Sequence, residues 1–166
     1  MKVMNHLENL LTVLTKLNID FVIIGGFAAM VHGSSQVTQD LDICCLLTEE
    51  QIATLREGLK NYNPRHRMTT EKLSFIDHPK QVAGIKNLYL ETNLVVLDIL
   101  SSVAGLGGFD QVVQGAMEIK IDGEVCKILS LEKLIKAKEA MSRLKDKLTV
   151  QELKVIAEEL SLKEKK

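Results

Sequence analysis

The sequence predicts an α/β protein in which helices flank a central β-sheet. Apolar runs of strand length at residues 19–24, 39–46 and 94–100 are separated by segments whose apolar residues recur at helical spacing. Residues 3–17 form the first such segment, with one apolar face made of Leu7, Leu10, Leu11, Leu14 and Leu17. Strands interspersed with amphipathic helices are typical of a sheet covered by helices.

Length and composition favour one compact domain. The chain has 166 residues, of which 46% are hydrophobic, enough for one well-buried core and short for two. We expect a sheet-centred core at residues 1–129 and a helical segment at 130–166. The 21 basic and 22 acidic residues nearly cancel, which excludes the strong overall positive field that drives non-specific nucleic-acid binding.

Cysteine usage and hydropathy indicate a cytoplasmic protein. The three cysteines have neither the pattern of a disulfide framework nor that of a zinc site. No secretion signal is evident at the N-terminus. The longest apolar stretch, residues 94–109, is interrupted by Asp98 and falls short of the ~20 residues that a membrane-spanning helix needs. We therefore expect no membrane partner.

The remaining elements follow from turn and cap signals. A glycine turn at Gly25-Gly26 opens a short helix, and Thr48 with Gln51 forms a capping box for the next. Asp122-Gly123 predicts a β-hairpin, followed by helices at 130–144 and, behind a second capping box at Thr149, up to Leu160. Between 62 and 93 the signal is weak, with strands expected at 73–76 and 87–90.

Three carboxylates carry the chemical signal. Asp40 and Asp42 lie two residues apart on a predicted strand, so both side chains leave the same face. Asp98 lies inside an apolar run, where a carboxylate costs several kcal/mol unless it is compensated. If the two strands are neighbours, the carboxylates can bind Mg²⁺ or Mn²⁺ for phosphoryl or nucleotidyl transfer. Gly25-Gly26 would let phosphate approach the backbone closely.

These motifs resemble the nucleotidyltransferase fold of the DNA polymerase beta-like superfamily, in which a strand, a Gly-Gly or Gly-Ser turn, a short helix and Asp-x-Asp follow one another. The match is closer to small bacterial proteins of the abortive-infection and toxin-antitoxin type, through Gly25-Gly26-Phe27-Ala28, His32-Gly33 and Thr38-x-Asp40-x-Asp42. The segment from Ser130 to Asp146 is similar to the helices that close those domains.

The resemblance implies a mixed central sheet and a magnesium-dependent enzyme. Asp40, Asp42 and Asp98 would be the metal-binding and catalytic residues. Nucleotide would contact Gly25, Gly26, Thr38 and Lys138. The reaction would move a nucleoside monophosphate from a triphosphate, such as ATP, to a hydroxyl of RNA, protein or a small molecule, with release of pyrophosphate. A toxin-antitoxin partner is also implied.

Two departures leave an alternative open. Phe27 replaces the serine of many polymerase-like members, and Gln36 replaces an arginine often found before Asp-x-Asp. Both weaken the expected grip on nucleotide, so a catalytically weak or inactive binding module on the same fold is the competing hypothesis. A phosphoesterase, with water as the acceptor, is a third. Lys138, in a buried helical stripe, is either a snorkelling side chain or a phosphate contact.

Overall fold

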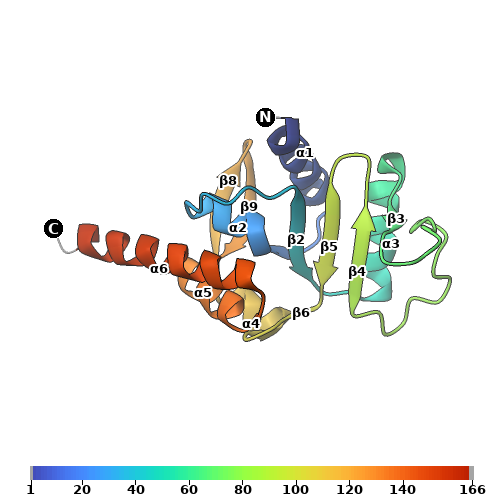
Figure 1. Cartoon of the computed structure of the whole chain (residues 1–166). Coiled ribbons are helices and arrows are strands. Elements are labelled where there is room, and N and C mark those ends of the chain that lie inside the picture. The colour runs from blue at the N-terminus through green and yellow to red at the C-terminus, as the bar shows by residue number, and fades with distance from the viewer. Residues whose placement is uncertain (1, 165–166) are drawn as a thin grey trace.

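The computed structural model describes residues 2–164 and contains a seven-stranded mixed sheet with helices on both faces (Figure 1). This confirms the predicted fold class. In spatial order the strands are β3 (Arg65–His66), β4 (Asn87–Glu91), β5 (Val96–Leu100), β2 (Asp40–Cys45), β1 (Phe21–Ile24), β9 (Glu124–Leu129) and β8 (Ala116–Ile121). A small second sheet pairs β6 (Ser102–Val103) with β7 (Gly107–Gly108).

Six α-helices accompany the sheet in the described part of the chain. They are α1 (Lys2–Lys16), α2 (Gly25–Val31), α3 (Glu49–Leu59), α4 (Phe109–Gln114), α5 (Leu131–Glu139) and α6 (Leu144–Glu164), and a 3₁₀ turn at Lys60–Tyr62 follows α3. Helices α5 and α6 pack together beside α2, and the far end of α6 projects away from the sheet (Figure 1). No helix among residues 2–164 is long and apolar enough to cross a membrane.

The central strands combine a buried face with a polar one. Leu41, Ile43, Leu97 and Ile99 are fully buried, which contributes about 1.5–3 kcal/mol each to folding. The alternate positions of β2 and β5 point to the opposite face because successive side chains of a strand alternate. The two strands run parallel, so this alternation aligns the acidic residues of both strands on one face.

The helix cap at Thr48 and the hairpin at Asp122-Gly123 are present in the structure. Thr48 caps α3 by accepting a hydrogen bond from the Gln51 backbone N–H at 3.1 Å. The Gln51 side chain does not return the bond, because its oxygen faces the thiol of Cys45 at 3.7 Å. The predicted hairpin joins β8 to β9, with positive φ at both Asp122 and Gly123, as a tight two-residue turn requires.

Two predictions about element boundaries were wrong. Residues 73–76 do not form a strand: Ser74 makes only an isolated β-bridge with Arg65, and a turn follows at residues 75–77. Phe75 is buried in this turn, and its carbonyl accepts a hydrogen bond from Arg56 Nε at 2.7 Å. At the C-terminal end, α5 stops at residue 139 and α6 begins at residue 144, so Thr149 lies inside a helix. Its hydroxyl donates a hydrogen bond to Gln36 Oε1 at 2.7 Å, so Thr149 makes a tertiary contact and does not cap a helix.

Candidate active site

One cavity brings together most of the residues that the sequence singles out. It has a volume of about 480 Å³ and is lined by Gly26, Thr38, Asp40, Asp42, Asp98 and Lys138, together with residues that the sequence did not indicate. The cavity therefore joins the carboxylates of two strands, one end of α2 and the helical segment in a single site.

Strand pairing places the third carboxylate. Because β2 and β5 are parallel neighbours in register, Asp42 lies directly opposite Asp98, and both side chains leave the same face of the sheet. Asp40, two residues before Asp42, shares that face. The two strands are therefore neighbours, as the predicted metal site requires.

Gly25 and Thr38 shape the edge of the carboxylate cluster. Gly25 has φ +71°, and a Cβ there would lie 2.3 Å from Asp42 Oδ2, so only glycine lets the carboxylate reach the start of α2. A Cβ on Gly26 would lie 3.2 Å from the Thr38 side chain. The Thr38 hydroxyl accepts a hydrogen bond from the Asp40 backbone N–H at 3.2 Å, which orients the entry into β2.

Within the cluster, the carboxylate of Asp42 has a clearly raised pKa. Burial, followed by repulsion from Asp98 and Asp40, raises the pKa of Asp42 from 3.8 to about 6, and Lys138 and Arg67 only partly oppose the rise. Oxygen ligands of this kind suit Mg²⁺ or Mn²⁺. The donor set therefore fits a divalent cation, which would compensate the clustered negative charge. No three acidic, histidine or cysteine side chains of residues 2–164 are already arranged around a metal position.

This shifted pKa gives a test of the cluster without substrate. Because the pKa of Asp42 is higher in the folded than in the unfolded chain, the native protein binds more protons between about pH 4 and 6. Metal-free wild type should therefore gain stability relative to Asp42→Asn as the pH falls from 7.5 to 5. Urea unfolding of both proteins at the two pH values measures this difference, and an unchanged difference would contradict the assigned coupling.

Asp98 is engaged by Arg67, a contact that the sequence did not predict. Arg67 forms a two-pronged ion pair with it, with Nε 3.0 Å from Oδ1 and Nη2 2.5 Å from Oδ2. The guanidinium also lies over the Tyr89 ring at 5.5 Å. Arg67 follows β3 in the segment with the weakest sequence signal, so only the pairing of β3, β4 and β5 reveals it.

Lys138 reaches the cavity from α5 and is held by a buried carboxylate. Asp146, 1% exposed, accepts from Lys138 Nζ at 3.4 Å and from Arg143 Nε at 2.7 Å. Burial raises the pKa of Asp146, but the hydrogen bonds and charges of Arg143 and Lys138 outweigh it and hold that pKa below its usual value. Lys138 is therefore a positioned cation with a buried stem.

Asp146→Asn tests this arrangement. Loss of the buried negative charge leaves the mostly buried Lys138 ammonium without its partner, so we expect the free energy of unfolding to fall by about 1–3 kcal/mol. Chemical denaturation measures the effect. The matched control is Glu139→Gln, which removes an exposed carboxylate 3.9 Å from Lys154 and should cost less than about 0.5 kcal/mol. Equal effects of the two substitutions would contradict the role of Asp146.

The two departures from the resemblance have structural explanations. Phe27 is 2% exposed and packs in the hydrophobic core, so this position supplies core packing in place of a serine hydroxyl for phosphate. Gln36 lines the cavity and accepts a hydrogen bond from Thr149, which connects the segment before β2 to α6. At this position the chain makes an internal contact in place of the expected cation.

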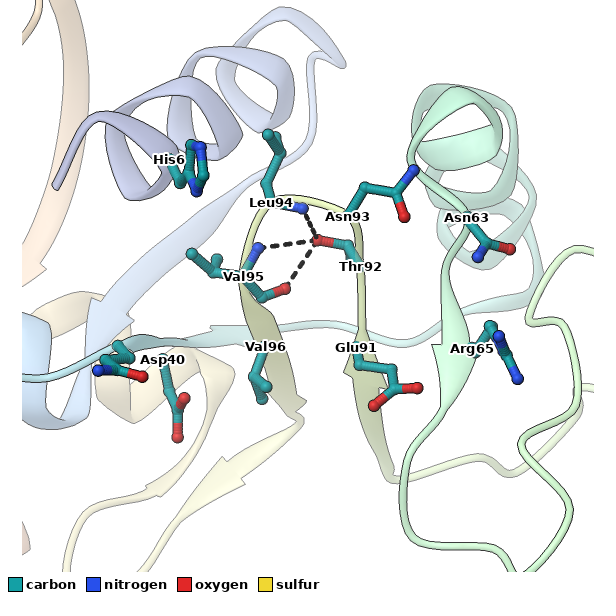
Figure 2. A pocket seen from close by; sticks show the side chains of 11 residues that line it. His6, Asp40, Asn63, Arg65, Glu91, Thr92, Asn93, Leu94, Val95 and Val96 are labelled. Atoms are coloured by element: carbon teal, nitrogen blue, oxygen red, sulfur yellow. Dashed lines mark hydrogen bonds between the residues drawn. The ribbon is translucent and has the colours of Figure 1, made fainter. Parts of the chain in front are cut away.

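A second pocket of about 450 Å³ shares Asp40 with the first cavity (Figure 2). Its lining is mainly polar and comes from α1, β3 and the β4–β5 turn. Thr92 shapes that turn, because its hydroxyl accepts from the backbone N–H groups of Leu94 and Val95 at 3.1 Å and donates to the Val95 carbonyl at 2.7 Å. Asp40 therefore lines both cavities. Further lining residues are His6, Gln39, Asn63, Arg65, Glu91 and Asn93.

Comparisons with known proteins agree with the fold. The family described as nucleotidyl transferase of unknown function (DUF2204) matches residues 3–166. The lincomycin-bound structure of the lincosamide antibiotic adenylyltransferase LnuA is 15% identical, with a TM-score of 0.59 over 92% of this chain and 96% of that one. An antigenic nucleotidyltransferase-like protein from Paracoccidioides brasiliensis is 17% identical, with a TM-score of 0.54 over 93% and 75%.

At these identities the two structures support the fold alone. No curated protein matched the sequence. The family match extends over nearly the whole chain, including both strands that carry the carboxylates and the helices that carry Lys138 and Asp146. The chain therefore belongs to the DUF2204 family of nucleotidyltransferases.

Proposed function

We propose that the protein is a cytoplasmic, Mg²⁺- or Mn²⁺-dependent nucleotidyltransferase that moves a nucleoside monophosphate from a nucleoside triphosphate, such as ATP, to a hydroxyl group. One observation carries the proposal: Asp42 lies opposite Asp98 on adjacent parallel strands, with Asp40 on the same face and a glycine turn against Asp42. Carboxylates on neighbouring strands beside a turn open to phosphate are what metal-assisted nucleotidyl transfer needs.

Each carboxylate has a role in this scheme. Asp40 and Asp42 would hold the divalent cation, and Asp98 would join them and accept the proton of the attacking hydroxyl. The cation would supply charge stabilisation to the transferring phosphoryl group. The acceptor oxygen bonds to the α-phosphorus, the bond from that phosphorus to the bridging oxygen breaks, and pyrophosphate leaves with the electron pair.

The phosphates would lie along the glycine turn. Gly25 and Gly26 leave the backbone free of Cβ atoms beside Asp42 and Thr38, and Lys138 provides a positive charge at the same cavity. In-line displacement places the attacking and leaving oxygens on opposite sides of the phosphorus. The acceptor would therefore approach from the β5 and β4 side of Asp40, where the pocket of Figure 2 lies.

That pocket favours a small polar acceptor over a polyanion. The charge of Arg65 is offset by Asp40 and Glu91, so the lining has no excess of positive charge for nucleic-acid phosphates. Amide side chains such as Asn63 and Asn93 can bind hydroxyl groups. RNA and protein hydroxyls remain the other acceptors to be tested.

The experiment is incubation of the protein with each α-³²P-labelled nucleoside triphosphate, magnesium or manganese, and a panel of acceptors. The panel comprises RNA, proteins and small hydroxylated compounds, with lincomycin included because the LnuA structure contains it. We expect label on one acceptor and release of pyrophosphate. Transfer that persists in the double variant Asp40→Ala/Asp42→Ala would contradict the proposal, and release of monophosphate alone would indicate a phosphoesterase.

A second candidate is a catalytically weak or inactive binding module on the same fold, such as one member of a toxin-antitoxin pair whose surface binds a partner protein. The observation that favours it is the ion pair between Arg67 and Asp98, which occupies the third carboxylate. This candidate predicts that the well-folded protein shows no measurable binding of magnesium and nucleotide in calorimetry, that no acceptor becomes labelled, and that the protein co-purifies with a stable partner.

A further inference from the structure

The ion pair between Arg67 and Asp98 is built into the sheet rather than made by a loose surface side chain. The backbone N–H of Arg67 donates to the Tyr89 carbonyl at 3.0 Å, and Tyr89 is the register partner of Asp98 on β5. The guanidinium crosses the Tyr89 ring to reach Asp98. Its third nitrogen donates to Met68 Sδ at 3.2 Å, so all three nitrogens have partners.

Burial makes this pair stronger than an ordinary surface ion pair. The side chains of Arg67 and Asp98 are 28% and 15% exposed, and bidentate guanidinium–carboxylate geometry is the strong form of the interaction. Both Asp98 oxygens face Arg67. Among the ion pairs of residues 2–164, none involves Asp40 or Asp42, so two carboxylates are open to a cation and the third is engaged.

Arg67 also lines the 480 Å³ cavity together with the carboxylates and Lys138. If Asp98 turns to a metal, the guanidinium loses its partner inside a partly desolvated cavity, where an unpaired charge is costly. A phosphate group offers a guanidinium two acceptor oxygens, as a carboxylate does, so the same bidentate contact can form. The phosphates of a bound nucleotide are the replacement partner that this cavity would receive.

We propose that Arg67 positions Asp98 before ligands bind, and that its guanidinium moves to the nucleotide phosphates when metal and nucleotide bind together. This inference rests on the proposed function. Metal that binds alone has to displace the Arg67 guanidinium from Asp98 without offering it a new partner. Nucleotide that binds alone is repelled by the three carboxylates. Each ligand binds weakly alone and strongly with the other, and the coupling is reciprocal.

Calorimetry with Mn²⁺, with α,β-methylene-ATP, and with both together tests the proposal on wild type, Arg67→Met, Arg67→Lys and Lys72→Met. Arg67→Met should bind Mn²⁺ alone about fivefold more tightly than wild type and the Mn²⁺–nucleotide pair about tenfold more weakly. Arg67→Lys, which keeps the charge without the fork, should fall between. Lys72→Met removes a nearby cation that pairs with Glu91 outside the cavity, and should match wild type within about twofold.

The opposite signs of the two effects separate this role from a structural one, because a misfolded site would weaken both affinities. Mn²⁺ affinity that is unchanged or reduced in both Arg67 variants would overturn the inference, as would loss of both affinities in proteins with native melting curves. If wild type binds Mn²⁺ and nucleotide and only the Arg67 prediction fails, the proposed function stands. If wild type binds neither, both fail.

Discussion

Asp42→Ala should reduce nucleotidyl transfer by about a thousandfold or more, roughly 4 kcal/mol of transition-state stabilisation. Asp42 lies at the centre of the cluster, opposite Asp98 and in contact with the glycine turn. The substitution should leave the protein folded. Because the pKa of Asp42 is raised to about 6, removing its charge should relieve repulsion in the native state at neutral pH.

Steady-state transfer of α-³²P-labelled nucleotide to the acceptor measures this effect, with melting curves to confirm the fold. The control is Asp20→Ala, which removes an exposed carboxylate, 77% accessible, just before β1. It should keep transfer within about twofold of wild type. An Asp42→Ala protein that retained a tenth of the wild-type rate would show that the cluster is not catalytic.

Gly25→Ala should have the second-largest effect, a loss of about a hundredfold in transfer. The new Cβ would lie 2.3 Å from Asp42 Oδ2 and 2.9 Å from its Cβ, so the carboxylate or the start of α2 must move. A displacement of about 1 Å in a catalytic group is enough for a hundredfold loss. Affinity for Mn²⁺ should fall in parallel because Asp42 is a proposed ligand.

Gly84→Ala is the matched control for backbone strain. Gly84 has φ +80°, close to the +71° of Gly25, but a Cβ there would meet no atom within 4 Å. Both variants should lose about 1–2 kcal/mol of stability from the left-handed conformation, and only Gly25→Ala should lose activity. Equal activity losses in the two variants would show that strain, not displacement of Asp42, is responsible.

The carboxylates could be found from the sequence because their signal is local. The two-residue spacing of Asp40 and Asp42 sets a shared face in any strand, and Asp98 stands out as a charge inside an apolar run. What the sequence could not show was that the strands are adjacent and in register. Nor could it show Arg67, whose position depends on the pairing of three strands across a segment with little periodicity.

In the helical segment, too, one part of the site could be predicted from the sequence and another could not. The buried position of Lys138 followed from helical spacing, and the structure places its ammonium at the cavity. The role of Asp146 was hidden because the helix boundary was misplaced: Thr149 has the sequence pattern of a cap but lies within α6. In the structure α6 begins at residue 144, and the Asp146 side chain contacts both Arg143 and Lys138.

The most direct test of the account is a crystal structure with Mn²⁺ and α,β-methylene-ATP. We predict an anomalous Mn²⁺ peak within coordination distance of Asp40 and Asp42, with the triphosphate against Gly25 and Gly26 in the 480 Å³ cavity. A peak away from these carboxylates, or a nucleotide bound outside that cavity, would contradict the claim that they form a metal–nucleotide site.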